Sequence, residues 1–408
     1  VRNIPNFAPI YSNPINLIHM NRKTLTTALV SLLLLVGCSE RQQRNELITI
    51  NASANYPEKE LVAQDFMDVE YVPLETTDDY LTQGDVQAIG NQYIVVKNWV
   101  NDGDIFLFDR KSGKAVKKIN RKGQGGEEYP YINNILLDEK RGELLVNSSV
   151  TNKIYVYDFD GNFLRSFPTP NEASFMELFD YDDENLIGYD TSSFVEEGKL
   201  PSKSYYHVIF SKKDGSITRE LPIPFEKVRA LVVQDGEYTA MASMRAIAPL
   251  RQGWALIETS TDTIYRYSPA KDRLSPLILR TSTDLPETFL TLCAETKDYY
   301  FMQTTQKEFD FTTGKGFEIT NLMYDKAAQK VFEPQIKNAD YEEGEPVDLC
   351  SHPMNKPIAA YQILQADQLV EAYREDELEG KLKEVAATLE EDSNPVVLIL
   401  TEKSSIKR

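Results

Sequence analysis

A glycine-rich stretch in the first third of the chain is the clearest candidate for chemistry. It reads Asn120-Arg-Lys-Gly-Gln-Gly-Gly-Glu-Glu-Tyr129. A phosphate-binding loop of the Walker type needs Gly-Lys-Ser/Thr leading into a helix, so that backbone N–H groups and the lysine meet the phosphates. Here Gly126 is followed by Glu127 and Glu128, which repel phosphate, and then by a strand pattern. The dinucleotide fingerprint fails for the same lack of a helix, so no phosphate site is predicted.

Other residues associated with metal binding or catalysis are few or badly spaced. The stretch Asp158-Phe-Asp-Gly-Asn162 lacks the further oxygen ligand and the distant glutamate of an EF-type calcium loop. Its Asp-Gly pair instead supplies the positive φ of a hairpin turn. Besides His19, the chain has His207 at the start of a strand and His352 in a Ser-His-Pro loop. No catalytic triad or Gly-x-Ser-x-Gly motif can be assembled, so we expect no catalytic residue, metal or cofactor.

The N-terminal region carries a targeting signal. Met20-Asn-Arg-Lys23 is a positive n-region, and Leu25–Val36 is a short, largely apolar stretch. Leu35-Val36-Gly37-Cys38 resembles the lipobox of bacterial lipoproteins. This resemblance implies cleavage before Cys38 and a diacylglyceryl thioether carrying palmitate on its sulfur. The alternatives are an ordinary signal peptide with an incidental cysteine and a short membrane helix, but a helix over this stretch spans only about 18 Å of a bilayer core of about 30 Å.

The chain divides into four parts in this interpretation. Residues 1–19 carry no targeting logic and are interpreted as an over-extended gene start, and residues 20–37 form the lipoprotein signal peptide. Residues 38–45 are a polar tether. Residues 46–408 form the folded domain, which is long enough to bury a sizeable core.

The charge of the chain excludes one class of partner. Removing Arg2, Arg22 and Lys23 with the leader lowers the formal net charge from −19 to −22. Such an acidic surface repels nucleic acid and anionic lipid headgroups. We therefore expect no nucleic-acid binding, and attachment to the membrane only through the lipid on Cys38.

The folded domain contains a repeat of about fifty residues. Ile105-Phe-Leu-Phe-Asp109 followed by Gly113 reappears as Ile154-Tyr-Val-Tyr-Asp158 followed by Gly161. A looser copy begins at His207, and further copies begin at Ile264 and Asn321. Each copy combines short alternating apolar runs with polar turns. Four short strands in each copy is the pattern of a β-propeller blade. One aromatic residue recurs at the equivalent place in every copy: Phe108, Tyr157, Phe210, Tyr267 and Tyr324.

Both ends of the domain should close the ring. Asp68–Glu75 and Pro395–Leu400 are strand patterns left over after five clear copies, and a sixth blade built from both removes the open edges. Residues 366–391 include apolar residues at i, i+4, i+7 and i+11 from Leu378, which predicts an amphipathic helix. This helix either packs on the propeller flank or binds a partner. The predicted fold is all-β: a six-bladed β-propeller of four-stranded antiparallel blades, the last closed by both termini, with a small C-terminal helical insertion.

Two cysteines remain in the folded domain. The interval from Cys293 to Cys350 equals the interval from Tyr267 to Tyr324, which is one blade repeat. The two cysteines should therefore occupy equivalent places on the first strands of neighbouring blades. We expect buried free thiols. The alternative, a disulfide between blades, needs Cα atoms within about 7 Å of each other.

Four stretches carry a family resemblance. They are Val69–Thr77, Arg121–Tyr129, Ile154–Gly161 and Asn394–Leu398. Together they resemble the six-bladed β-propeller lipoproteins common in Bacteroidota, which are relatives of the NHL and TolB-like propellers. That family usually has Gly-Pro-Gly-Glu where this chain has Gly125-Gly-Glu-Glu128. The resemblance covers nearly all of the folded domain, and it implies the fold and a location in the cell envelope rather than an activity.

The segment that crosses from the first blade to the second carries the candidate ligand-binding residues. In a four-stranded blade, such crossovers share one face with the loops between strands two and three. We expect Trp99 and Tyr129 to be partly exposed on this face, and Arg121 or Glu128 to point toward the channel mouth. An indole beside Gln, Glu and Arg suits a sugar, which presents an apolar face and hydroxyl edges. In the alternative, Arg121 and Glu128 satisfy the crossover backbone and Trp99 caps the blade. The candidates are Trp99, Arg121, Gln124, Glu128 and Tyr129.

These features favour a binding protein over an enzyme. We expect a monomeric, lipid-anchored propeller of the outer membrane, on its periplasmic or its surface side, that binds a glycan, peptide or partner protein on the crossover face without catalysis. The alternative is a lyase or hydrolase acting on a polysaccharide or small ester at the channel mouth.

Overall fold

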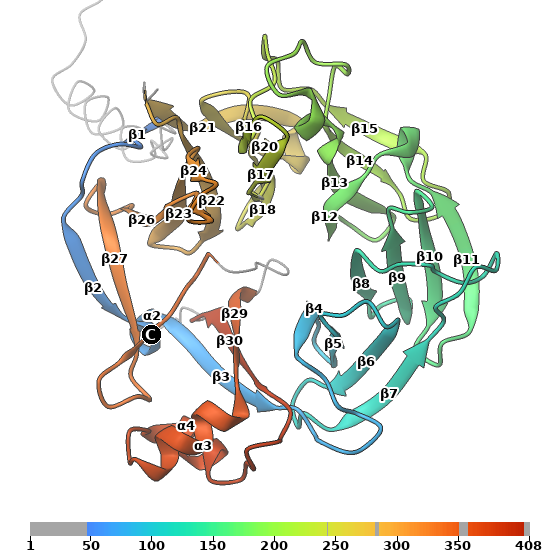
Figure 1. Cartoon of the computed structure of the whole chain (residues 1–408), viewed down its shortest axis with the longest axis vertical. Helices are drawn as coiled ribbons and strands as arrows, with labels where there is room; N and C mark the ends of the chain where they lie inside the picture. Colours follow the sequence, from blue (N-terminus) through green and yellow to red (C-terminus); the bar gives the residue numbers. More distant parts are fainter. Residues whose placement is uncertain (1–46, 243, 282–284, 351–357, 404–408) are drawn as a thin grey trace, which may run out of the picture. The chain divides into compact units, whose positions relative to one another are not determined.

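Residues 47–242, 244–281, 285–350 and 358–403 are described by the computed structural model. In this part of the chain, six mainly antiparallel sheets follow one another around a common axis as the blades of a β-propeller (Figure 1). The predicted fold class is confirmed. The predicted leader, the tether, Cys38 and His352 lie outside the described residues.

Blades one to three are four-stranded sheets in which the order along the chain equals the order in space, from the axis outward. Blade one contains β4 (Asp85–Ile89), β5 (Tyr93–Lys97), β6 (Asp104–Asp109) and β7 (Ala115–Asn120). Blade two contains β8 (Asn134–Asp138), β9 (Glu143–Ser148), β10 (Lys153–Asp158) and β11 (Phe163–Pro168). Blade three contains β12 (Phe175–Asp180), β13 (Asn185–Asp190), β14 (His207–Ser211) and β15 (Ile217–Leu221).

Blades four and five carry an extra parallel strand on their outer edge, which the sequence did not predict. Strand β1 (Ile48–Asn51) pairs with β21, and β2 (Glu58–Val62) pairs with β27, so the N-terminal segment covers two sheet edges that would otherwise be open. Blade four contains β18 (Ile247–Leu250), β19 (Gly253–Leu256), β20 (Thr263–Ser268) and β21 (Arg273–Thr281). Blade five contains β22 (Thr288–Glu295), β23 (Tyr299–Gln306), β26 (Ile319–Asp325) and β27 (Lys330–Asn338), and the short β28 (Glu345–Pro346) pairs with β27.

Blade six is built from both ends of the chain, as predicted. Strand β30 (Val396–Glu402) lies between β29 (Ile358–Leu364) and the N-terminal β3 (Met67–Pro73), and both pairings are antiparallel. In the described residues this blade has three strands rather than the expected four.

The helical insertion lies between β29 and β30. It consists of α3 (Ala366–Arg374) and α4 (Gly380–Ala386) instead of one continuous helix. The break falls where Asp376 and Gly380 adopt positive φ angles of 62° and 53°. Leu378 and Leu382 are fully buried against Val396, which fits the predicted packing on the flank of blade six. A single turn, α2 (Ala63–Phe66), connects β2 to β3, and within the described ranges no helix is long and apolar enough to cross a bilayer.

The core consists of separate apolar clusters, one between each pair of neighbouring blades. Successive side chains of a strand point to opposite faces of its sheet. In β5, Ile94 and Val96 therefore pack toward blade six, while Val95 packs toward blade two. Because both faces are buried, the inner strands read as short apolar runs, which is the pattern from which the repeat was predicted.

Two hairpins lie outside the blade pattern. Strands β16 (Val232–Asp235) and β17 (Tyr238–Met241) form a sheet of their own in the segment between blades three and four. Strands β24 (Phe309–Asp310) and β25 (Lys315–Gly316) form another between β23 and β26. Both hairpins belong to connections on the crossover face.

Cys293 and Cys350 are joined by a disulfide, with their Cα atoms 4.8 Å apart. The expectation of free thiols is therefore wrong. The expected equivalence of their positions is also wrong, since Cys293 lies in β22 but Cys350 lies in the segment that precedes β29. Both belong to the core cluster between blades five and six, so packing of the two blades brings the sulfur atoms together.

Candidate functional site

Tyr129, one of the predicted site residues, is completely buried between blades one and two. Its hydroxyl donates to the carbonyl oxygen of Gly103 over 2.7 Å and accepts from the backbone N–H of Arg121 over 2.9 Å. Burial raises the pKa of Tyr129 to about 12. The expected exposure is wrong because the ring packs inward and its hydroxyl ties the crossover to the loop after β5.

Arg121 and Glu128 bond backbone groups. The Nε of Arg121 donates to the carbonyl oxygen of Gly161, in the outer turn of blade two, over 2.8 Å. Oε2 of Glu128 accepts from the backbone N–H of Gly125 over 2.8 Å. A Cβ added to Gly123 would lie 1.9 Å from the same oxygen, so this glycine is needed for the close approach. These contacts match the alternative in which both side chains satisfy backbone groups.

Trp99 and Gln124 are exposed. The side chain of Trp99 is 67% exposed, as expected, in the loop between β5 and β6. Its backbone N–H donates to Oε1 of Gln83 over 3.1 Å. Gln124 lies exposed in the crossover after β7. A contact of either residue with a ligand stays a prediction.

Two cavities open on the crossover face close to the axis of the ring. One, of about 310 Å³, lies among blades three, four and five. The other, of about 260 Å³, lies among blades one, two, three and six. Met176, Glu177 and Arg245 line both, so the cavities meet there. We call the combined region the crossover mouth; its polar side chains include Asp85, Lys97, Asn134, Glu177, Arg245, Thr291, Gln303 and Tyr361.

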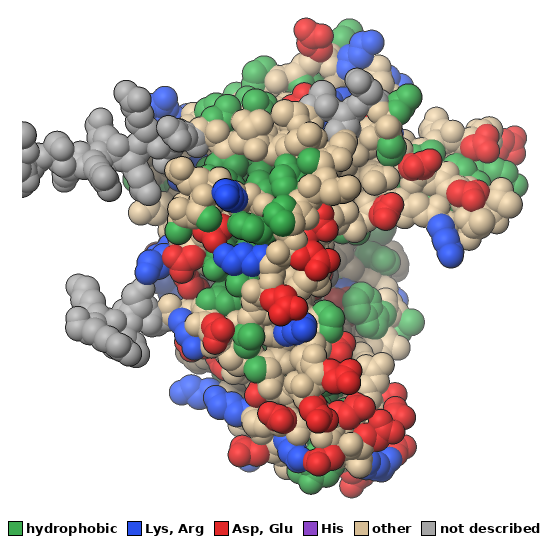
Figure 2. Space-filling model, turned by 90° about the vertical axis from the view of Figure 1, so that its left-hand side faces the viewer, with side chains coloured by type: hydrophobic (Ala, Val, Ile, Leu, Met, Phe, Trp, Pro, Cys, Tyr) green, Lys and Arg blue, Asp and Glu red, His purple; other side chains and the backbone are tan. Residues whose placement is uncertain are grey.

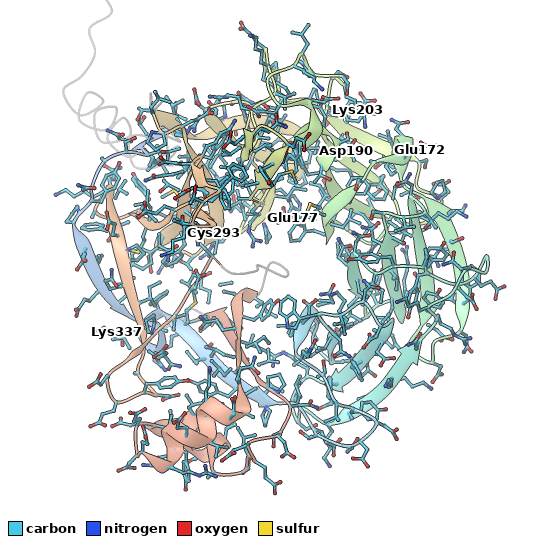
Figure 3. All side chains as sticks on the ribbon, in the orientation of Figure 1. Glu172, Glu177, Asp190, Lys203, Cys293 and Lys337 are labelled. Carbon is cyan, nitrogen blue, oxygen red and sulfur yellow. A yellow bond between two sulfur atoms is a disulfide. The ribbon has the colours of Figure 1, made fainter. Side chains whose placement is uncertain are left out.

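Glu177 is held by the backbone of the neighbouring blade. It lies in β12, and its Oε2 accepts from the backbone N–H groups of Ala246 over 2.8 Å and Ile247 over 3.3 Å. Burial raises the pKa of Glu177, although the positive charge of Arg245 and the two N–H groups act in the opposite direction. Figure 3 shows Glu177 at the inner edge of the ring, whereas Lys337 lies on the outside.

Arg245 stands beside Glu177 and lies two residues before the start of β18. Its Nη2 donates to the carbonyl oxygen of Cys350 over 3.4 Å, so the disulfide fixes one of its partners. Burial lowers the pKa of Arg245, and the carboxylate of Glu177 opposes that shift. A guanidinium is therefore placed between blades four and six at the wall of both cavities.

A second charged pair lines the other side of the mouth. Nζ of Lys97, at the end of β5, forms an ion pair with Oδ2 of Asp85, at the start of β4. The hydroxyl of Tyr361 donates to the carbonyl oxygen of Val86 over 3.0 Å and is buried between blades six and one. Charges of both signs thus face a common space.

Two buried polar atoms of the mouth have no hydrogen-bond partner among the described residues. They are Oδ1 of Asn134 and Oγ1 of Thr291. The amide nitrogen of Asn134 donates to the carbonyl oxygen of Met176 over 3.1 Å, which turns its oxygen away from that contact. Thr291 is 5% exposed. Most buried polar groups are paired, so these two atoms mark positions where a polar ligand would gain hydrogen bonds.

Hydrophobic side chains are exposed around the mouth. Most of the exposed large hydrophobic residues lie in crossovers, in loops between second and third strands, or at the adjoining strand ends. On the side of the molecule where β2 and β27 lie, Lys and Arg side chains are interspersed with Asp and Glu, with hydrophobic side chains between them (Figure 2). The ion pairs on this side include Lys59–Asp325 at 2.7 Å. Exposed hydrophobic residues of the crossover face include Trp99, Tyr131, Leu200, Tyr238, Leu285 and Ile319.

His207 supports the mouth from the core. It is buried, and its Nε2 lies 3.0 Å from the carbonyl oxygen of Ala246, the residue whose N–H binds Glu177. Burial lowers the pKa of His207 to about 4. Asp158, considered for calcium, accepts the backbone N–H groups of Asp160 and Asn162 and thus forms the expected hairpin turn. No cluster of three or more metal-ligating side chains occurs in the described ranges.

Sequence reasoning missed Glu177 and Arg245. They lie far apart along the chain, in different blades, and share no motif. One signal was available, because Glu177 is the charged residue within the otherwise apolar strand Phe175-Met-Glu-Leu-Phe179. A charge inside an inner strand of a propeller faces either a neighbouring blade or the channel, and both environments require a partner.

A comparison with a solved structure agrees with the fold. A crystal structure of a protein from Bacteroides fragilis, described as exported, has 15% sequence identity and a TM-score of 0.58, covering 88% of this chain and 100% of that chain. A member of the DUF4221 family from Bacteroides vulgatus has 10% identity and a TM-score of 0.48, covering 84% and 100%. No curated protein matches the sequence. The family described as "Domain of unknown function (DUF4934)" matches residues 47–401, and the chain belongs to this family.

Proposed function

We propose that this protein is a lipid-anchored β-propeller of the cell envelope that binds a glycan, peptide or partner protein in the crossover mouth, without catalysis. The observation that carries this proposal is the pair of cavities that meet at Glu177 and Arg245. Charged groups of both signs line this space, together with the atoms of Asn134 and Thr291 that have no partner among the described residues. A mainly concave site with a few convergent polar groups is typical of ligand binding.

The location in the cell envelope is supported by three features. The disulfide between Cys293 and Cys350 suits an oxidising compartment. The lipobox-like stretch before Cys38 supports lipid attachment, and the similar Bacteroides fragilis protein is described as exported. We expect an outer-membrane lipoprotein on either its periplasmic or its surface side. Cys38→Ser should release the protein from the membrane fraction, and unchanged fractionation of this variant would contradict lipidation.

The binding proposal is tested with the Cys38→Ser protein in solution. A library of cell-envelope oligosaccharides and peptides is screened for compounds that raise its melting temperature. We expect at least one class to do so, and Arg245→Met to remove the shift. Tyr373→Ala, an exposed site on α3, is the control and should keep it. A shift that survives Arg245→Met would place binding elsewhere.

A second candidate function is an enzyme acting on a polysaccharide. Glu177 has a raised pKa and lies beside Arg245 in a cavity, and catalytic acids share this environment. Release of reducing ends from polysaccharides, lost in Glu177→Gln, would favour the enzyme. Binding without any turnover would favour the binding protein.

A further inference from the structure

The two hairpins outside the blades carry an aromatic cluster. Tyr238 of β17 lies 6.2 Å from Phe311, measured between ring centroids. Phe309 lies 4.9 Å from Phe311 and 5.6 Å from Phe317. We call these four rings the hairpin aromatic cluster. Because each hairpin forms a sheet of its own, the cluster does not belong to any core between blades.

The hairpin aromatic cluster is accessible. The side chain of Tyr238 is 71% exposed, and the three phenylalanines are partly exposed. Exposed aromatic rings lose the stabilisation that burial gives them, and contiguous exposed apolar groups commonly mark interaction sites. Packing between the propeller blades therefore does not explain why aromatic residues occur here.

Each of the two hairpins is close in sequence to residues that line the crossover mouth. Strand β17 ends at Met241, and the next residue, Ala242, lines the cavity among blades three to five. On the other hairpin, Phe317 is followed two residues later by Ile319, which lines the same cavity. Both hairpins are therefore joined by short stretches of chain to residues that line the cavity.

The nearby cavity wall supplies hydrogen-bonding groups. Oγ1 of Thr291 is buried, lacks a partner among the described residues, and belongs to a residue that lines this cavity. Gln303 lines it as well, and its Nε2 is already engaged with Oδ1 of Asn321 over 2.9 Å. A ligand here meets ring faces on one side and hydroxyl, amide, carboxylate and guanidinium groups on the other.

We infer that the ligand of the crossover mouth is a saccharide chain, with one end in the cavity and a further sugar ring against the hairpin aromatic cluster. This inference rests on the proposed function and names its ligand class. A pyranose ring offers an apolar face that packs on aromatic rings and hydroxyl groups that hydrogen-bond at its edge. Since the cluster and the cavity adjoin but are distinct, an oligosaccharide fits both and a monosaccharide fits only one.

The test uses the Cys38→Ser protein and isothermal titration calorimetry. The probes are cellohexaose, maltohexaose, xylohexaose, chitohexaose and hexagalacturonate, together with the monosaccharide of each. We expect at least one hexasaccharide to bind at least tenfold more tightly than its monosaccharide. Tyr238→Ala should weaken that hexasaccharide about tenfold and leave its monosaccharide unchanged, as the loss of an exposed aromatic anchor does.

Two further variants separate the cluster from the cavity. Thr291→Val should weaken the hexasaccharide and the monosaccharide alike. Tyr373→Ala removes an exposed tyrosine on α3, outside the crossover face, and should change neither. Equal melting temperatures of wild type and Tyr238→Ala would show that the fold is intact, as expected for an exposed side chain.

The outcomes against the inference are distinct from those against the proposed function. If none of the five hexasaccharides binds, or if Tyr238→Ala leaves the affinity unchanged, the inference is overturned. If peptides bind instead and lose affinity in Arg245→Met, the crossover mouth remains the site and only the saccharide class fails. If neither saccharides nor peptides respond to Arg245→Met, binding of both these ligand classes in the crossover mouth fails as well.

Discussion

Buried polar groups are paired to different degrees at the two ends of the propeller axis. Opposite the crossover mouth, a cavity of about 250 Å³ lies at the far ends of β4, β8 and β12. There Nζ of the buried Lys212 lies 2.8 Å from Oδ2 of Asp138 and 2.7 Å from Oδ1 of Asp180. At the crossover mouth, Asn134 and Thr291 each keep a buried oxygen without a partner in the described part of the chain.

We interpret this difference in terms of the proposed binding function. A buried cation with two carboxylates is costly to break but gives a ligand little to bond. Unpartnered polar atoms lower stability, and functional sites commonly accept this cost. We therefore propose that the ion pairs of Lys212 mainly stabilise the fold and that the crossover mouth binds the ligand.

The largest effect should come from Lys212→Met. Removing the cation leaves the buried Asp138 with only the Nη1 of Arg141, 3.9 Å away, and the backbone N–H of Arg141 as partners. Loss of a buried ion-pair partner typically costs about 3–5 kcal/mol of unfolding free energy. Urea denaturation measures this loss. Lys140→Met is the matched control, because its ion pair with Asp183 is exposed and should contribute less than about 1 kcal/mol. Equal losses of unfolding free energy in the two variants would contradict a special stabilising role of Lys212. Ligand affinity should be unchanged in both variants.

Loss of the disulfide should lower the unfolding free energy somewhat less than Lys212→Met does. It should also lower ligand affinity at the crossover mouth. Replacing both Cys293 and Cys350 by alanine removes a covalent link between distant parts of the chain, for which about 2–4 kcal/mol is expected. The carbonyl of Cys350 also positions Arg245, so ligand affinity should fall. Denaturation and titration of the double variant measure both quantities. Unaltered affinity would mean that the bridge does not support the mouth.

Acid should lower the unfolding free energy by protonating His207, which lies below the crossover mouth. The pKa of His207 is about 4 in the folded protein and 6.5 in its ordinary state, so the folded state prefers the neutral ring. Its stabilisation is complete above pH 6.5 and is lost as the pH falls toward 4, by about 3 kcal/mol at 1.36 kcal/mol per pKa unit. His207→Gln should show a flatter dependence of unfolding free energy on pH over this range. Parallel curves for the two proteins would show that another group controls acid stability.

Thr291→Val should separate binding from stability most cleanly. The methyl group replaces a hydroxyl that has no partner in the described chain, so unfolding free energy should change by less than about 1 kcal/mol or rise. Ligand affinity should nevertheless fall. A clear loss of stability would instead mean that the hydroxyl is bonded within the fold.

Trp99→Ala should have the smallest effect on stability. Its side chain is 67% exposed, and surface substitutions usually change unfolding free energy by less than about 0.5 kcal/mol. If Trp99 is a contact at the rim of the site, affinity should fall at least tenfold while the melting temperature barely moves. An unchanged affinity would remove it from the site.

The blades could be predicted because their signal is local. Strands such as Ile105–Phe108 are buried on both faces, so each shows its own apolar run, and the run repeats with every blade. Strands β1 and β2 could not be predicted, since they pair in parallel with β21 and β27, which lie in the second half of the chain.

Among the predicted site residues, Tyr129 is buried and Arg121 and Glu128 bond backbone groups, whereas Trp99 and Gln124 are exposed and stay candidates. Tyr129 follows two glutamates, which suggests exposure, yet its ring fills the core between blades. Glu177 and Arg245 come from different blades and meet only when the ring closes. No local pattern encodes such a meeting, apart from a lone charge within an apolar strand.

Hydrogen–deuterium exchange with and without a bound hexasaccharide or peptide tests the central claim most directly. The Cys38→Ser protein is used, at saturating concentration of whichever probe binds in the screens. We predict slower exchange at Ala246 and Ile247 and in the first half of β22, around the crossover mouth. Protection at the turns after β8 and β12, beside Lys212, with none at the crossover mouth, would contradict the account.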